Sequence, residues 1–294
     1  MSDHENLIVD IAEWVDRVSA DPVAHLERQA TEVLLTALGK TPSIGDRVYL
    51  KGGILMGVVY RSIRSTSDID FTTDLIPDVS LPALIRKELN DAFPRATADI
   101  GYPDLLFNVQ TLKVRPSPAG LLSAMFPALE IKVGYALRGT PQEKRFLAGK
   151  SVDVLSVDIS FNEPIGAIQL VRLSGDTNAS IHAYSLNDII SEKIRALLQQ
   201  IKRNRNRRQD VYDLNLLISR FEFSDQEKAE LLNVLLVKCH AREITPDQLA
   251  LENPEIAERA RAEWRSLALE IGELPDFDNC FATINRFYKS LPWD

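Results

Sequence analysis

The stretch that decides the fold begins with Val48-Tyr49-Leu50-Lys51-Gly52-Gly53-Ile54-Leu55-Met56-Gly57 and continues with Arg64-Ser65-Thr66-Ser67-Asp68-Ile69-Asp70-Phe71-Thr72. Its first part is a short apolar run that ends in Lys-Gly-Gly, which predicts a strand followed by a sharp turn. Residues 54–60 have the composition of a short helix, and residues 68–71 alternate polar and apolar side chains. The stretch therefore predicts a strand, a glycine turn, a helix and a second strand.

This order of elements suits a site for phosphate and metal. Glycines between a strand and a helix let backbone N–H groups approach phosphate oxygens, and the helix N-terminus adds positive potential. Asp68 and Asp70 stand two positions apart on the second strand, so both carboxylates point to the same face. Such a pair can bind a divalent cation, and Mg²⁺ prefers carboxylate together with phosphate oxygens. Each motif alone usually marks a turn or a solvated strand edge, but their combination favours nucleotidyl transfer.

These residues resemble a known family. Lys51-Gly52-Gly53, Arg64 and Ser67-Asp68-Ile69-Asp70-Phe71 are similar to the signature of AbiEii/AbiGii-type toxin nucleotidyltransferases, within the DNA polymerase β-like superfamily. Ile54 replaces the usual threonine, Thr66 stands in place of serine, and Ser67 in place of glutamate. The resemblance implies that Asp68 and Asp70 are catalytic metal ligands. It also implies a group of nucleotide-binding residues, namely Lys51, Gly52, Gly53, Arg64, Thr66 and Ser67.

A third carboxylate is expected on a later strand. Residues 155–161 alternate apolar positions, which places Asp158 on the other face of that strand. Polymerase-like nucleotidyltransferases complete their metal site from a neighbouring strand, and the resembling family commonly has an acid-Ile-Ser-Phe segment here. We therefore select Asp158 as the third metal ligand. Asp153 and Glu130 are rivals, and a plain solvated aspartate is the alternative.

The predicted secondary structure changes near Tyr184, from a mixture of helices and strands to helices alone. Before it we expect helical stripes over residues 5–18 and 22–38, and a helix over residues 79–93 that Pro94 ends. Three strands follow, at Leu105–Val114, Ala128–Leu137 and Val152–Phe161. After them we expect two short strands or a hairpin around residues 175–178. Beyond Tyr184 the segments are helical, the clearest late ones being residues 225–237, 254–271 and 277–291. We predict an α+β fold, with a polymerase β-like mixed sheet and flanking helices over residues 1–184 and a mostly helical domain over residues 185–294.

The helical part contains a second group of candidate residues. Lys193 lies inside a helix, and residues 202–208 contain five cations in seven positions. Asp210 and Asp213 follow on one helix face. This pattern also has an explanation without any function. The basic run can be a solvated loop between helices, and the acidic side chains can stabilise the helix N-terminus. The resembling family, however, carries Ala-Glu-Lys-Leu and Arg-Asp-x-Tyr-Asp-Leu motifs here, which implies that Lys193 reaches nucleotide phosphate and that Asp210, ranked above Asp213, orients it or transfers a proton.

Composition limits the classes of protein and the cellular locations that remain. The net charge of −8 argues against a general nucleic-acid coat. No apolar run is long enough to span a membrane, the N-terminus is acidic, and two cysteines are too few for a disulfide framework, so we expect a cytoplasmic protein.

The resemblance implies a metal-dependent toxin of a toxin–antitoxin or phage-defence system. Such an enzyme would use Mg²⁺ or Mn²⁺ to transfer NMP from an NTP to RNA, with the 3′ end of tRNA as one candidate, and would have a cognate antitoxin. Two alternatives stay open. One is protein nucleotidylation, in which AMP or UMP is added to a side chain, and the other is a non-catalytic nucleotide-binding regulatory partner.

Overall fold

The computed structural model describes residues 6–173 and 179–293. The described chain divides into two compact units. The sheet unit contains the described residues of 1–61, 66–163 and 168–183, and the helical unit contains residues 62–65, 164–167 and those from 184 onward. Within these residues no helix has the length and apolar character needed to cross a bilayer.

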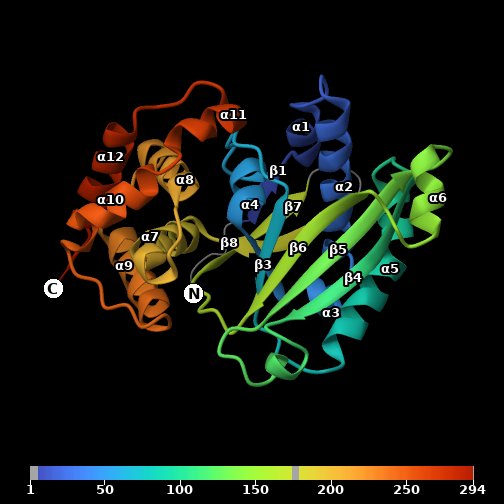
Figure 1. Ribbon diagram of the computed structural model, residues 1–294, viewed down its shortest axis with the longest axis horizontal. Helices are drawn as coiled ribbons and strands as arrows, with labels where there is room; N and C mark the ends of the chain where they lie inside the picture. Colours follow the sequence, from blue (N-terminus) through green and yellow to red (C-terminus); the bar gives the residue numbers. More distant parts are fainter. Residues whose placement is uncertain (1–5, 174–178, 294) are drawn as a thin grey trace. The chain divides into compact units, whose positions relative to one another are not determined.

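An eight-stranded mixed sheet forms the centre of the sheet unit in the described chain (Figure 1). Its spatial order is β1-β7-β8-β2-β3-β6-β5-β4. The strands are β1 (Asn6–Val9), β2 (Val48–Lys51), β3 (Asp68–Thr73), β4 (Leu105–Arg115), β5 (Ala128–Leu137), β6 (Asp153–Phe161), β7 (Ile168–Leu173) and β8 (Ser180–Tyr184). β3 runs parallel to β6 and antiparallel to β2, while β5 is antiparallel to both β4 and β6. The predicted α+β class with a mixed sheet is therefore confirmed.

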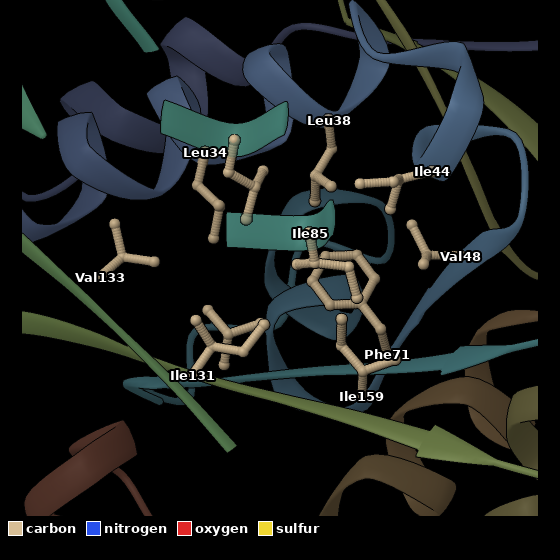
Figure 2. Close-up of a pocket in the computed structure, with 11 residues that line it drawn as sticks. Leu34, Leu38, Ile44, Val48, Phe71, Ile85, Ile131, Val133 and Ile159 are labelled. Carbon is tan, nitrogen blue, oxygen red and sulfur yellow. The ribbon is translucent and has the colours of Figure 1, made fainter. Parts of the chain in front are cut away.

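The core of this unit lies between one face of the sheet and helices α2 (Pro22–Gly39), α3 (Pro42–Gly45) and α5 (Leu81–Asp99). Alternate strand residues point to these helices, as the period of a strand requires. Figure 2 shows apolar side chains of the sheet and of these helices pointing toward one another. They enclose a cavity of only ≈ 10 Å³. The lining residues are Leu34, Leu38, Ile44, Val48, Phe71, Ile85, Leu89, Ile131, Val133, Val157 and Ile159. Because the cavity is apolar and no larger than a water needs, it is a packing gap and not a ligand site.

Shorter helices complete the sheet unit. They are α1 (Ile11–Asp16), α4 (Gly52–Val58), the 3₁₀ helix η1 (Ala119–Leu121) and α6 (Pro141–Leu147). The long helix α2 begins where the sequence predicts. The Asp21 side chain accepts hydrogen bonds from the N–H groups of Val23 and Ala24, and Pro22 occupies the first turn. An aspartate cap followed by proline is a strong helix start.

The helical unit is built from α7 (Leu186–Arg203), α8 (Arg208–Arg220), α9 (Asp225–His240), η2 (Ala250–Glu252), α10 (Pro254–Arg261), η3 (Trp264–Leu267), α11 (Ala268–Ile271) and α12 (Phe277–Lys289). Local sequence sets the helix ends. Ser185 caps α7, whose last turn stops at Asn204 in the left-handed conformation. Ser224 and Glu227 form a reciprocal capping box at the start of α9.

Three local predictions are wrong. Residues 6–9 form β1 instead of the first turn of a helix, because this segment pairs with β7 along the edge of the sheet. Pro94 lies inside α5 and does not end it, since residues on both sides of the proline are buried against the sheet unit. The expected helix over residues 254–271 is broken at Glu263, whose backbone is left-handed. The predicted turn at residues 175–178 lies outside the described residues.

Candidate active site

A row of charged side chains crosses four neighbouring strands of the sheet. Lys51 on β2 is the register partner of Asp70 on β3, Asp70 of Asp158 on β6, and Asp158 of Glu130 on β5. Register partners on adjacent strands lie about 5 Å apart and share a face. Their chain neighbours Phe71, Ile159 and Ile131 line the core, so the charged row occupies the opposite face. We call Asp70, Asp158 and Glu130 the carboxylate row.

The same alternation places the other predicted acids. Asp68 precedes Asp70 by two residues, is exposed, and therefore belongs to the face of the carboxylate row. Asp153 has the strand parity of Leu155 and Val157, which are buried in the core. It therefore belongs to the opposite face from Asp70. Of the rivals for the third ligand position, strand geometry supports Asp158 and Glu130 and disfavours Asp153.

The glycine turn packs directly against Asp70. Gly52 has a φ of +70°, and a Cβ atom at this position would overlap the Oδ2 atom of the Asp70 carboxylate. Glycine is therefore needed here both for its backbone conformation and for its missing side chain. Gly53 is buried in the first turn of α4. The structure thus brings the predicted Gly-Gly turn and the predicted metal ligand Asp70 into contact.

Lys51, at the end of β2, forms an ion pair with Glu163 in which both side chains are almost entirely buried. Glu163 was not anticipated from the sequence, because it lies far along the chain and outside every motif. The predicted nucleotide-binding residues Thr66 and Ser67 lie just before β3, the first half-buried and the second exposed. Their roles stay predictions.

A buried network of charges surrounds Lys193 in the helical unit. The Nζ atom of Lys193 donates to Asp210 Oδ1 at 3.0 Å and to Asp213 Oδ2 at 2.7 Å. Arg64, from the short segment of residues 62–65, donates to both oxygens of Asp213 through Nε at 3.3 Å and Nη2 at 3.2 Å. Its Nη1 atom lies 3.6 Å from Glu270. The structure therefore places the predicted nucleotide-binding residue Arg64 on carboxylates of the helical unit.

This network is charged in the folded protein. Burial works to raise the pKa of Asp213, but the charges of Lys193 and Arg64 outweigh it and hold that pKa below its usual range. Burial likewise works to lower the pKa of Lys193, but Asp213 and Asp210 raise that pKa above its ordinary value. The side chain of Asp213 is fully buried, whereas that of Asp210 is 14% exposed. Asp213 thus holds the network together, and Asp210 is the aspartate that retains some access.

The cations of residues 202–208 differ in their surroundings. Lys202 pairs with Glu243 at 2.7 Å, Arg208 with Glu263 at 3.1 Å, and Arg207 lies 3.6 Å from Asp210. Arg203 and Arg205 are exposed, and neither forms an ion pair within the part of the chain that the structure describes. The sequence pattern alone does not separate these two arginines from their neighbours.

The donor set suits a hard divalent cation, because it consists of carboxylate oxygens on one sheet face beside a turn with no Cβ atom. Among the described residues, however, no group of three or more His, Cys, Asp or Glu side chains is arranged to hold a metal ion. Asp158 instead contacts Arg115 at the end of β4, with Nη2 3.1 Å from Oδ1. Arg115 was missed from the sequence, because its contact depends on the pairing of β4, β5 and β6.

The chain is similar to several known proteins. Residues 34–283 match the family model described as nucleotidyl transferase AbiEii toxin, type IV toxin–antitoxin system. JHP933 from Helicobacter pylori is similar in fold, with a TM-score of 0.51 and 12% identity over 92% of each chain. MenT4, a nucleotidyltransferase toxin from Mycobacterium tuberculosis, gives a TM-score of 0.49 and 15% identity over 96% of this chain and 98% of that chain. No curated protein sequence matches the chain.

Proposed function

Because this chain belongs to the AbiEii family of nucleotidyltransferase toxins, we propose that it transfers NMP from an NTP to an RNA acceptor and releases pyrophosphate. Enzymes of this family generally use an NTP and a divalent metal, and type IV systems pair the toxin with an antitoxin. We propose Mg²⁺ or Mn²⁺ as the metal and the cytoplasm as the place of action. The observation that carries the proposal is the register match of Asp70 and Asp158 beside the Gly52 turn.

In this proposal Asp68 and Asp70 hold the metal, and Asp158 joins them. A bound divalent cation would lower the pKa of the acceptor hydroxyl and stabilise the leaving phosphate oxygen. The turn at Gly52 and Gly53 presents backbone to the triphosphate without side-chain obstruction. The carboxylate row lies on the sheet face opposite the apolar core. This position supports its assignment as a metal site, because metal-binding oxygens must stay accessible to solvent and to the NTP.

The remaining nucleotide-binding residues are proposed to act on the triphosphate by charge and hydrogen bonding. Thr66 and Ser67 offer hydroxyl donors just before β3. Lys51, at the end of β2, would contribute its charge while paired with Glu163. Lys193 has three N–H donors. Its contacts with Asp210 and Asp213 use two of them. With no further acceptor given to it by the described residues, the third donor would bind a phosphate oxygen, with the Asp210 carboxylate orienting the ammonium group or accepting a proton.

The exposed side chains of Arg203 and Arg205 support an RNA acceptor. The specific acceptor that we propose is the 3′ end of tRNA. An RNA substrate needs cations that are not already neutralised, since release of counterions from phosphate supplies much of the affinity. These two exposed arginines meet that requirement in a chain whose net charge is −8. The pairing of Lys202, Arg207 and Arg208 with carboxylates favours protein nucleotidylation as the second candidate, because a protein acceptor needs few cations.

The test is an incubation of the full-length protein with each α-labelled NTP, Mg²⁺ or Mn²⁺, and either total tRNA or total protein. Label transferred to tRNA, and its loss in an Asp70→Ala variant, would support the proposal. Label transferred only to protein would establish the second candidate. Absence of pyrophosphate release with every combination of NTP, metal and acceptor would overturn both and leave a nucleotide-binding partner without turnover. Mass spectrometry of the labelled tRNA would identify the nucleotide added and the end that carries it.

A further inference from the structure

Arg115 bridges two members of the carboxylate row. Its Nη1 atom lies 3.1 Å from Glu130 Oε1 and its Nη2 atom 3.1 Å from Asp158 Oδ1. Glu130 and Asp158 are direct register partners on β5 and β6. Like charges directly opposite each other destabilise a sheet. The guanidinium, a planar group that can contact two carboxylates at once, supplies the charge that balances them.

Breaking the ion pair between Arg115 and Asp158 costs little free energy. The side chains of Arg115, Glu130 and Asp158 are 50%, 38% and 42% exposed, so water competes readily with both ion pairs. Exposed ion pairs of this kind contribute about 0.2–1 kcal/mol. The ion pair is therefore weak enough for a divalent cation to displace.

We propose that Arg115 is a positioning residue that competes with the divalent cation for Asp158. It holds the Asp158 carboxylate in the metal-free protein and gives it up when the cation binds to the carboxylate row. This inference rests on the proposed function, because it requires Asp70 and Asp158 to be metal ligands. It explains why Asp158 shares a face and a register with Asp70 while its side chain contacts an arginine.

The chain offers a matched control on the same strand. Lys113 carries the same charge, precedes Arg115 by two residues on β4, and is the register partner of Glu130. It therefore belongs to the same sheet face. Within the described residues it forms no ion pair with Asp158. Removing the Lys113 charge changes the electrostatic field near the carboxylate row and leaves the Arg115 contact in place.

The experiment measures Mn²⁺ binding to the full-length protein without NTP, by the loss of the free Mn²⁺ electron paramagnetic resonance signal. Removal of the competing ion pair in Arg115→Gln should tighten Mn²⁺ binding about two- to fivefold, in keeping with the strength of exposed ion pairs. Arg115→Lys should return the affinity toward the wild-type value, and Lys113→Gln should change it less than Arg115→Gln does. In an Asp158→Asn background, Arg115→Gln should have no further effect. Circular dichroism checks that each variant is folded.

Several outcomes would overturn the proposal. If Arg115→Gln leaves the Mn²⁺ affinity unchanged or weakens it, Arg115 does not compete with the cation for Asp158. An equal gain in affinity with and without Asp158 shows that the effect is not exerted through that carboxylate. Asp70→Ala distinguishes failure of the Arg115 role from failure of the proposed metal site. If Asp70→Ala abolishes Mn²⁺ binding and Arg115→Gln has no effect, only the role of Arg115 fails; if Asp70→Ala binds Mn²⁺ as wild type does, the metal assignment in the proposed function fails with it.

Discussion

A Cβ atom at Gly52 would overlap the carboxylate of Asp70, so the residue that turns the chain and the residue proposed to bind metal are fitted to each other. The overlap arises because β2 and β3 are antiparallel neighbours and the turn after Lys51 bends over the register partner of that lysine. Substitution at the turn should therefore change the position of a proposed catalytic group and not only the stability of the fold.

We predict that Gly52→Ala sharply lowers nucleotidyl transfer, because its methyl group displaces Asp70. Gly139→Ala is the control: Gly139 also has a positive φ, of +77°, but, apart from its chain neighbours, no heavy atom of the described residues lies within 4 Å of a Cβ built there. Both variants should lose about 1–2 kcal/mol of stability from the left-handed backbone. Transfer assays and urea denaturation test this, and equal activity of the two variants would show that the fit to Asp70 is unimportant.

Asp70→Ala should abolish transfer and leave the fold intact. Loss of a metal ligand removes several kcal/mol of transition-state stabilisation, which corresponds to a rate decrease of more than about 100-fold. Asp153→Ala is the matched control, because Asp153 belongs to the face of the sheet opposite Asp70. Pyrophosphate release and thermal unfolding should be measured for both. A folded Asp70→Ala enzyme with near wild-type turnover would refute the metal assignment.

The two aspartates of α8 should separate stability from activity. Asp213→Asn removes a buried charge that serves both Lys193 and Arg64. Breaking such a buried pair costs about 3–5 kcal/mol. Asp210→Asn should cost less stability, because Asp210 retains some exposure, but should lower transfer as strongly as Lys193→Ala does. Denaturant unfolding and transfer assays on the three variants test this; a greater loss of stability in Asp210→Asn would reverse the assignment.

The same network predicts how stability depends on pH. The pKa of Asp213 is lower in the folded protein than its ordinary value of about 3.9. The folded state therefore binds fewer protons at this group, and its stabilising contribution is complete above the unfolded pKa and is lost as pH falls through the folded pKa. The difference in unfolding free energy between wild type and Asp213→Asn should thus be constant near neutral pH and shrink below about pH 4. A difference that grows on acidification would contradict the charged network.

RNA binding should depend on the exposed arginines Arg203 and Arg205. Arg203→Ala combined with Arg205→Ala should weaken tRNA binding at low salt and leave NTP affinity nearly unchanged. The slope of log affinity against log salt should become shallower by about 0.7–0.9 for each RNA phosphate that the variant no longer neutralises. Lys202→Ala combined with Arg208→Ala is the control, since those cations are already paired with glutamates. If both double variants bind tRNA as wild type does, the acceptor proposal loses its structural support.

The features that the sequence predicts correctly are those that depend on local pattern. The Asp21 cap, the strand-turn-helix around Gly52 and the alternation of Asp68, Asp70 and Asp158 all depend on residues close in the chain. Pairing partners far apart in sequence were not predictable. The strand at residues 6–9, the continuation of α5 through Pro94 and the contacts made by Arg115 and Glu163 each depend on a distant segment. Tertiary packing outweighed local preference at these places.

The chain passes between the two units five times, because residues 62–65 and 164–167 belong to the helical unit although sheet-unit residues precede and follow each of them. Arg64 of the first segment is buried on Asp213, and the carbonyl of Pro164 in the second accepts a hydrogen bond from Lys238. A fragment truncated after residue 184 would therefore retain a guanidinium and a carbonyl whose partners have been removed. The protein should be expressed and engineered as one indivisible chain, and loss of toxicity in a truncated form would reflect this shared construction and not the removal of an independent module.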